Sequence, residues 1–336
     1  MRRRTLLRGA AAAGVTAAGG GLALFGVEEA DAATYNVMVT EQSSNRVLVF
    51  ANGDSNWTDG NIVWQWSAPS GASWTNLSDV KRRSTAAWDD VLLVAASGTA
   101  PDGGRAAMVD QSDKTTIWTS NVPGNPHAVE RIVNHGAIVV ASSRARSFSS
   151  AFSDGGGLSL FVPSSHGGKP STSYSSSISV GFEGAHGALW DTTHGLLLAI
   201  GKGGLRAYQL VTDADDFITG LTLVGSKTFS GTGHDLQPDY SSGKLFYTVG
   251  GTGADHGVWE TTLSGSGTSW TFTSTRIETW TYTKAYSRLP DATSFWVDAP
   301  SDTVWWNDTV GFDPGVDSAR SGAKFYKSRY WTTSFL

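Results

Sequence analysis

Short apolar runs recur along the chain, and each is too short to form a helix. They cover 36–39, 91–95, 137–141, 196–200, 245–249 and 304–306, and aligned positions in them recur every 46 to 59 residues. After a turn rich in Gly, Ser or Asp, each is followed by a second run in which apolar and polar residues alternate. These second runs cover 46–50, 105–109, 158–162, 205–210, 258–263 and 323–330. The pattern predicts repeated pairs of β-strands.

Segments rich in Trp add an outer strand to these pairs, at 62–66, 116–118 and 270–280. A unit of roughly 40 to 50 residues with four short strands is typical of a β-propeller blade. Six units can be counted, although the first has no clear inner strand and the last no clear outer strand. We therefore expect an all-β chain folded as a β-propeller of four-stranded blades. Six blades are favoured and seven are allowed, because a weakly patterned blade fits within the longer units. A β-sandwich, single or paired, is the competing architecture.

Three of the units share a histidine at one position. His127, His186 and His234 each stand nine residues before a glycine. Because the innermost strand of a blade begins beside the central channel, we expect the three imidazoles to converge on the mouth of that channel. Converging titratable groups in a cleft are typical of a functional site. The alternative is that these side chains cap turns between blades by hydrogen bonding to backbone carbonyl groups.

Basic and polar residues are expected around the same channel mouth. In the second unit, counting nine residues back from Asp90, at the corresponding turn, reaches Lys81, which is followed by Arg82. The other candidates come from inner-strand starts and from connections between second and third strands: Tyr286, Arg288, Arg144, Arg146 and His256. A basic funnel on a chain that is acidic overall predicts an anionic ligand. The alternative for the two loop arginines is that they bridge surface loops.

Composition narrows the function classes further. The 336 residues include 40 Gly, 14 Trp and no Cys, and the formal charge is −5. Without Cys there are no disulfides, thiolate metal sites or cysteine nucleophiles. A mildly acidic chain with no run rich in Lys or Arg is not expected to bind nucleic acid. Most Trp side chains are expected to pack between blades, and Trp57, Trp74 and Trp88 are the better candidates for stacking on sugar rings.

The first 33 residues have the features of an export signal. The segment MRRRTLLR is followed by a weakly apolar stretch of Ala and Gly and ends in ADAA. The paired arginines before two leucines resemble the twin-arginine motif, and a cleavage site of the small-x-small type follows. We therefore expect residues 1–33 to be removed and residues 34–336 to form a single propeller domain. The product is expected to be secreted, extracellular and monomeric, with no membrane anchor.

A family resemblance is carried by EQSSNRVLVF at 41–50, HGALWD at 186–191 and GKGGLRAY at 201–208. These segments look like uncharacterised secreted propeller proteins of actinobacteria. More remotely, the fold and the His/Arg funnel resemble the propeller-fold polysaccharide lyases, in particular the rhamnosyl-glucuronate lyases. Those lyases are generally described as seven-bladed, so a count of six units is a departure. The oligogalacturonate lyases, a further relative, bind a divalent metal ion through His, which implies His127, His186 and His234 as ligands if a metal is bound.

The resemblance implies β-elimination on a uronate-containing glycan, with an anionic carbohydrate as the partner. His127 or His186 would remove the proton, and Tyr286 or a second His would protonate the leaving oxygen. Arg144 or Arg146 would neutralise the uronate carboxylate. Further substrate contacts would come from His234, Lys81, Arg82, His256 and Arg288.

Two other functions stay open at this point. One is a lectin-like propeller that binds a glycan without cleaving it, and the other is an inert structural propeller, since a fold alone establishes no activity. A lectin with one site per blade would repeat its contact residues in nearly every unit. The histidines occupy three units of six, which favours one central site.

Overall fold

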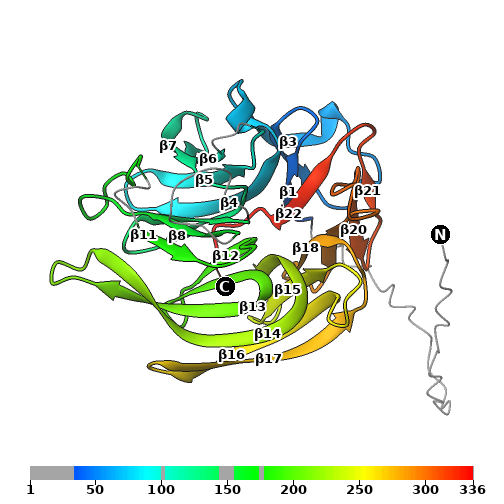
Figure 1. Ribbon diagram of the computed structural model, residues 1–336. Coiled ribbons are helices and arrows are strands. Elements are labelled where there is room, and N and C mark those ends of the chain that lie inside the picture. Colours follow the sequence, from blue (N-terminus) through cyan, green and yellow to red (C-terminus); the bar gives the residue numbers. More distant parts are fainter. Residues whose placement is uncertain (1–33, 100–102, 144–154, 174–177, 336) are drawn as a thin grey trace, which may run out of the picture. The chain divides into compact units, whose positions relative to one another are not determined.

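The computed structural model describes residues 34–99, 103–143, 155–173 and 178–335. Over these residues the chain forms 22 strands and two short 3-10 helices, η1 (Asp59–Asn61) and η2 (Ala72–Trp74). The strands make four four-stranded antiparallel sheets and one six-stranded sheet, arranged around a central axis as a β-propeller (Figure 1). The predicted all-β propeller is therefore confirmed. In the described part of the chain, no helix is long and apolar enough to cross a membrane.

Three of the four-stranded sheets run in sequence order, with the first strand nearest the axis. The second blade contains β4 (Leu77–Thr85), β5 (Asp89–Ala96), β6 (Gly104–Asp110) and β7 (Thr116–Val122). The third contains β8 (Pro126–Ile132), β9 (Ala137–Ser142), β10 (Gly157–Phe161) and β11 (Ile178–Gly181). The last contains β18 (Thr283–Arg288), β19 (Ser294–Asp298), β20 (Thr309–Asp313) and β21 (Ser318–Ala319).

The six-stranded sheet occupies two positions around the axis. Its strands are β12 (Gly187–Asp191), β13 (Leu196–Thr212), β14 (Ile218–Pro238), β15 (Leu245–Gly250), β16 (Gly257–Ser266) and β17 (Ser269–Glu278). The long β14 pairs first with β13 and then with β15, and Thr232 pairs with both, opposite Lys202 and Gly250. One strand therefore serves as the outer edge of one blade and the inner strand of the next.

The inner strands form a closed ring. Each contacts the next in the order β4, β8, β12, the end of β14, β18 and a final strand, β22 (Phe325–Tyr330), which returns to β4. Counted by inner strands, the ring has six positions, four of them held by separate four-stranded sheets. Six is also the number of units counted from the sequence.

The C-terminal strand closes the ring in a way that the sequence pattern did not reveal. Residues 323–330 were predicted as the second run of the last unit. Instead β22 pairs with β1 (Asn36–Glu41), which continues through β2 (Arg46–Ala51) to β3 (Ile62–Ser67). The first unit lacked an inner strand because the other end of the chain supplies it. The prediction of a strand at 304–306 is also wrong, since β19 takes that place.

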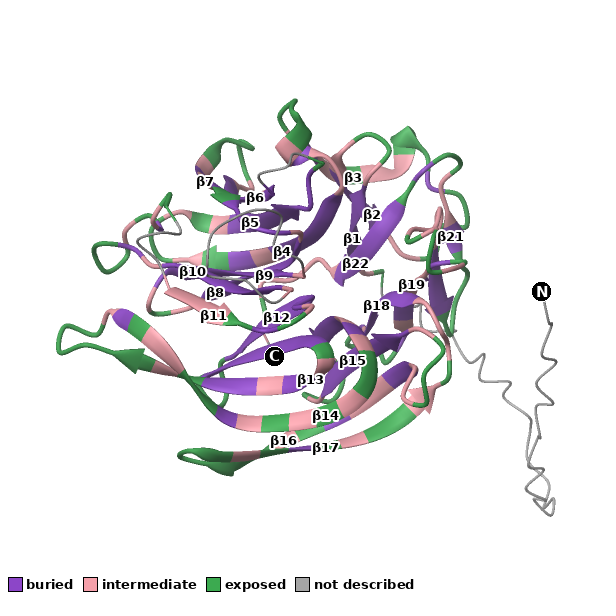
Figure 2. Ribbon diagram, in the orientation of Figure 1, coloured by how far each residue is buried: buried purple, intermediate pink, exposed green. Residues whose placement is uncertain are grey.

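The apolar side chains are buried between and within the sheets, as the purple strands around the axis show (Figure 2). Trp57 is 1% exposed and stacks on Phe50, with ring centroids 4.4 Å apart. Trp74 is buried as well, and Trp88 packs against the core cluster that joins the second and third blades. Burial of Trp57 and Trp74 withdraws them as candidates for stacking on a sugar.

The three glycines that follow the shared histidines have one structural role. Gly136, Gly195 and Gly243 have φ angles of 72°, 66° and 70°. They lie in the turns that join inner to second strands, where a left-handed conformation favours Gly because it has no Cβ. The nine-residue spacing therefore measures the distance from a hairpin turn to the start of the inner strand.

Candidate functional site

The site begins with an irregularity repeated at the start of the inner strands. The pairing register shifts at His127 in β8, at His234 in β14 and at Lys284 in β18, and His186 lies directly before β12. A β-bulge of this kind bends the strand and re-aims a side chain. Tyr326 lies at a similar shift between β22 and β1.

The structure brings the three histidines together. The rings of His127 and His186 stack with centroids 3.9 Å apart and planes 9° from parallel. His234 meets His186 edge-on, with centroids 5.1 Å apart. The three imidazoles line one cavity of about 500 Å³ at the end of the axis, which we call the axial pocket.

The axial pocket has a polar lining. Its other ionisable residues are Lys284, Asp302 and Tyr326, and its large aromatic residue is Trp305. The amide and hydroxyl side chains of the lining belong to Gln42, Asn76, Asn125, Ser97, Thr99 and Ser143. Pockets that bind small ligands typically have volumes of about 300 to 1,000 Å³, and the axial pocket falls in this range.

Hydrogen bonds fix the orientation of the imidazoles. His186 Nδ1 lies 2.6 Å from the carbonyl oxygen of Gly184. Because a carbonyl only accepts, Nδ1 carries the hydrogen, and the neutral ring keeps its lone pair on Nε2. His127 lies between two hydroxyl groups, with Tyr326 Oη 3.1 Å from Nδ1 and Ser143 Oγ 2.8 Å from Nε2.

Lys284 is a buried lysine without an ion pair. Its side chain is 4% exposed, and its Nζ lies 3.4 Å from His234 Nε2. Over the described ranges of the chain, no carboxylate lies within 4.0 Å of this ammonium. Lys284 is also the one Lys or Arg among the described residues that line the axial pocket.

Burial sets the charge of these groups. It lowers the pKa of His186 to about 3, and it lowers the pKa values of His127 and His234 well below their usual range. The pKa of Lys284 falls to about 8, mainly through burial and partly offset by Asp298. In each case the charged form loses hydration that the protein does not replace. At pH 7 the three imidazoles are neutral, and Lys284 is mostly protonated.

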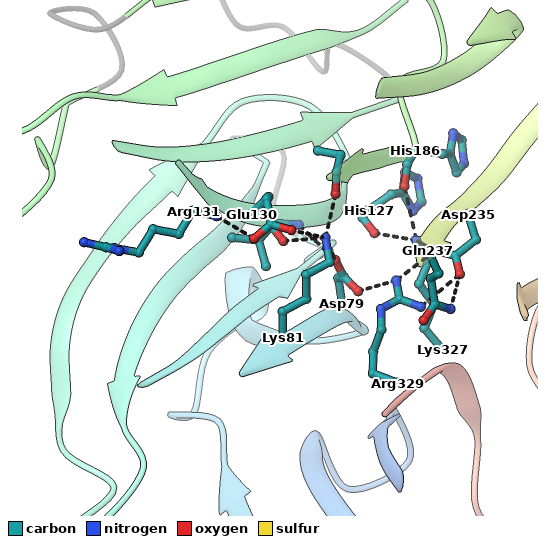
Figure 3. Close-up of polar contacts among 12 residues, drawn as sticks. Asp79, Lys81, His127, Glu130, Arg131, His186, Asp235, Gln237, Lys327 and Arg329 are labelled. Carbon is teal, nitrogen blue, oxygen red and sulfur yellow. Dashed lines mark hydrogen bonds and ion pairs between the residues drawn. The ribbon is translucent and has the colours of Figure 1, made fainter. Parts of the chain in front are cut away.

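A buried network of charges fills the axis below the pocket. We call it the axial ion network, and Figure 3 shows its central members with dashed contacts. Its members are Asp79, Lys81, Arg83, Glu130, Asp235, Lys327 and Arg329. Arg329 donates to both Asp235 oxygens at 2.9 and 2.8 Å and to Asp79 at 2.6 Å. Buried charges are retained when each is paired and hydrogen-bonded, as here.

The network also positions the histidines. Lys327 Nζ donates to the backbone carbonyls of His127, at 2.9 Å, and His186, at 3.1 Å, and it pairs with Asp235 at 3.2 Å. One ammonium therefore ties the two blades that carry the stacked rings. This side chain is 0% exposed, so it supports the pocket from beneath rather than touching a ligand.

Lys81 and Arg82 do not line the axial pocket. The β4–β5 hairpin pairs two residues further than the β8–β9 hairpin, to Thr85 opposite Asp89, so counting nine residues back stops inside the strand, short of its start at Leu77. Lys81 lies deeper along the axis, where its Nζ donates to the carbonyls of Val129 and Ala188. Arg82 pairs with Asp90 and covers the ring of Trp331.

The remaining predicted residues lie elsewhere. Tyr286 donates to Ser294 Oγ at 2.8 Å and packs edge-on against Phe246. Arg288 pairs with Asp239 at 2.8 Å and covers the same phenylalanine. His256 is in the connection before β16, where its Nδ1 meets the Gly253 carbonyl. Arg144 and Arg146 lie outside the described residues.

Lys284, Tyr326 and Trp305 line the pocket but were not predicted as site residues. Lys284 was missed because the last unit was aligned on the run at 304–306, beyond β19, instead of on the turn that follows β18. Tyr326 was missed because β22 was assigned to the last unit rather than the first. Trp305 was placed in a strand, whereas it lies outside the strands and is 45% exposed. Assigning 323–330 as the missing inner strand of the first unit would have placed Tyr326 at the pocket.

The donor arrangement does not favour a metal ion. Among the residues with described positions, no three or more His, Asp or Glu side chains are grouped to hold one. His127 meets hydroxyl groups at both ring nitrogens, and the parallel stacking on His186 prevents the two rings from pointing at one centre. The described lining residues therefore do not fit a bound metal ion.

Comparison with known proteins adds similarities of fold. No family model matches the chain, and no curated protein matches it. A functionally unknown protein from Desulfotomaculum acetoxidans is 13% identical, with a TM-score of 0.47 over 88% of this chain and 80% of that one. The Cps50 (Swd1) β-propeller domain from Myceliophteria thermophila is 10% identical, with a TM-score of 0.48 over 88% and 86%. A putative 6-phosphogluconolactonase from Bacteroides uniformis is 9% identical, with a TM-score of 0.47 over 88% and 99%.

Proposed function

We propose that the protein is a secreted, carbohydrate-active propeller that binds a uronate-containing glycan in the axial pocket and cleaves it by β-elimination. The observation that carries this proposal is the convergence of three neutral imidazoles, one lysine and one tyrosine on a single cavity of about 500 Å³. Amide and hydroxyl groups line the rest of the cavity and suit the hydroxyl groups of a sugar.

In the proposed reaction, a base removes the proton beside the uronate carboxylate. A carbon–carbon double bond then forms as the bond to the glycosidic oxygen breaks, and an acid protonates that oxygen. His186 is suited to be the base, because its Nε2 holds a lone pair while Gly184 holds its Nδ1 hydrogen. Tyr326, whose hydroxyl lies beside His127, is suited to be the acid in place of Tyr286.

The carboxylate itself requires a cation. Lys284 can supply it, since its ammonium has no carboxylate partner within the described structure and faces the pocket. A bound carboxylate would favour the charged amine and raise its pKa from about 8. Arg144 and Arg146 remain proposed contacts, because the connection that carries them begins at Ser143, a lining residue.

Trp305 extends the proposed site at its rim. Its indole Nε1 donates to Gln42 Oε1 at 3.1 Å, which fixes the edge of the ring while 45% of the side chain stays exposed. An exposed aromatic face beside a polar cavity can stack on the apolar face of a sugar ring. We therefore propose that Trp305 stacks on the sugar unit next to the uronate.

A second candidate function is glycan binding without cleavage. It is favoured by the pKa of about 3 for His186, because a group so reluctant to take a proton is a weak general base. The same pocket, with Lys284 for the carboxylate and Trp305 for the ring, would then act as a binding site alone.

Export is a separate proposal that rests on residues 1–33. Their twin-arginine pattern supports secretion of a folded chain. Expression in a bacterial host with twin-arginine export should place the protein in the medium, and replacing Arg3 and Arg4 by Lys should retain it in the cells. Equal secretion of both forms would contradict this route.

The test of cleavage uses a panel of uronate-containing polysaccharides. The protein is incubated with gum arabic and pectic oligomers, with and without a chelator, and the ultraviolet absorbance of unsaturated uronate is followed. We expect product from wild type and from His256→Ala, whose histidine lies outside the pocket, and none from His186→Ala. Product formation that His186→Ala leaves unchanged would refute the assigned base. No product from any glycan, together with retention on immobilised glycan, would support the binding function instead.

A further inference from the structure

Lys284 differs from the other buried lysines of the axis. Lys81 and Lys327 each lie within 3.6 Å of a carboxylate and donate to two backbone carbonyls, so their ammonium groups are saturated with acceptors. Lys284 meets a neutral imidazole, His234, at 3.4 Å, and no carboxylate of the described residues lies within 4.0 Å of it. A lysine in such surroundings gives up its proton readily and becomes a nucleophile.

The position of Lys284 makes this amine accessible to a small molecule. The side chain is on the wall of a cavity of about 500 Å³, although it is only 4% exposed. The cavity wall next to it carries His186, His234 and hydroxyl or amide groups, and no Cys competes as a nucleophile anywhere in the chain. Desolvated lysine amines attack carbonyl carbons.

We propose that Lys284 is a carbonyl-reactive site, which forms a Schiff base with a small hydroxylated aldehyde or ketone such as the open-chain form of a sugar. The Nζ lone pair attacks the carbonyl carbon and a carbon–nitrogen bond forms. A proton passes from nitrogen to the former carbonyl oxygen, and water leaves as the carbon–nitrogen double bond forms. The sum is amine plus carbonyl giving imine plus water, so no oxidant or reductant is needed.

His234 is the positioning residue for this step. Its Nε2 faces Nζ at 3.4 Å, so the neutral ring can accept a hydrogen bond from the amine and hold it in one orientation. Burial keeps His234 neutral, so this acceptor stays available to the amine. This site goes beyond the proposed glycan cleavage and does not depend on it.

The test is reductive labelling of the intact protein at pH 7. Glyceraldehyde is added with sodium cyanoborohydride, which traps the imine as a stable secondary amine, and peptide mass mapping gives the rate at each lysine. Lys169, an exposed lysine of the same molecule, is the internal comparator. An amine with a pKa of about 8 has on the order of 100-fold more free base at pH 7 than an ordinary lysine. A free amine of lower basicity is a weaker nucleophile, so we expect Lys284 to be labelled at least about 10-fold faster than Lys169.

Labelling of Lys284 at the rate of Lys169 or slower would overturn the proposal, and this comparison needs no variant to fold. The positioning role is tested with His234→Asn, for which labelling of Lys284 should slow several-fold while Lys169 is unaffected. His256→Asn is the matched control and should leave both rates unchanged. Because the readout is covalent labelling, its failure leaves glycan cleavage untouched, and the absence of cleavage leaves the labelling result untouched.

Discussion

Lys284 and Lys327 occupy neighbouring inner strands, yet their surroundings are opposite. Lys327 is 0% exposed, pairs with Asp235 and donates to two carbonyls, whereas Lys284 is 4% exposed and has an imidazole as its polar partner. One side chain belongs to the axial ion network and the other to the axial pocket. The difference shows that burial alone does not decide the role of a charge, because the partners decide whether it holds strands together or stays available.

The largest expected effect comes from replacing each lysine by Met. Removing one partner of a buried ion pair costs about 3 to 5 kcal/mol, because the other charge is left without compensation. Lys327→Met should therefore lose about that much free energy of unfolding, measured by urea denaturation at pH 7. Lys284→Met should not lower it at pH 7, since it leaves no carboxylate unpaired and removes a desolvated charge. Equal losses in the two variants would erase the distinction between network and pocket.

The next effect concerns function at the pocket. General base catalysis contributes on the order of 100-fold or more to a rate, so His186→Ala should lower the rate of unsaturated uronate release by at least that factor. Its urea unfolding midpoint should stay close to that of wild type, because the ring lies above the ion network. A loss of activity that follows a loss of folded protein would assign His186 to structure instead.

Stability should also depend on pH through Lys284. The pKa is about 8 in the folded state, below the value of about 10.4 for an unfolded chain, so the unfolded state binds more protons between these values. The free energy of unfolding of wild type should thus rise relative to Lys284→Met as the pH rises from 7 to 10, by on the order of 2 kcal/mol. Urea titrations of both proteins at several pH values measure it. A difference that is flat with pH would show that Lys284 is not desolvated.

The smallest effect is expected at the rim. Trp305→Ala should weaken binding of a uronate-containing oligosaccharide by about 10-fold, since a stacked aromatic ring contributes about 1 kcal/mol beyond its buried area. Calorimetric titration measures this affinity. Trp306→Ala is the control, because Trp306 packs under Lys324 and is not among the described lining residues. If both variants bind as wild type does, the sugar does not reach the rim.

The sequence predicted the parts of this arrangement that repeat. A glycine with positive φ marks each of three hairpin turns, and from it the distance to His127, His186 and His234 is constant. The prediction failed where the hairpin length changes, as at Lys81, where two extra residue pairs lengthen the hairpin and nine residues no longer reach the start of the strand. It also failed at Tyr326, because no local pattern states that residues about 290 positions apart pair as β22 and β1. Partners such as Lys327 and Asp235 are set by tertiary contact, which residue spacing cannot encode.

The closure of the ring by β22 has a consequence for the order of events during synthesis. Tyr326, Lys327 and Arg329 lie on β22, which follows the other described strands, so this part of the pocket wall and the centre of the ion network are made after the rest of the ring. Until that strand docks beside β1, Asp79 and Asp235 face each other without the guanidinium that joins them. Docking of β22, closure of the ring and formation of the site are therefore a single event. A nascent chain that has all its histidines still has no finished pocket.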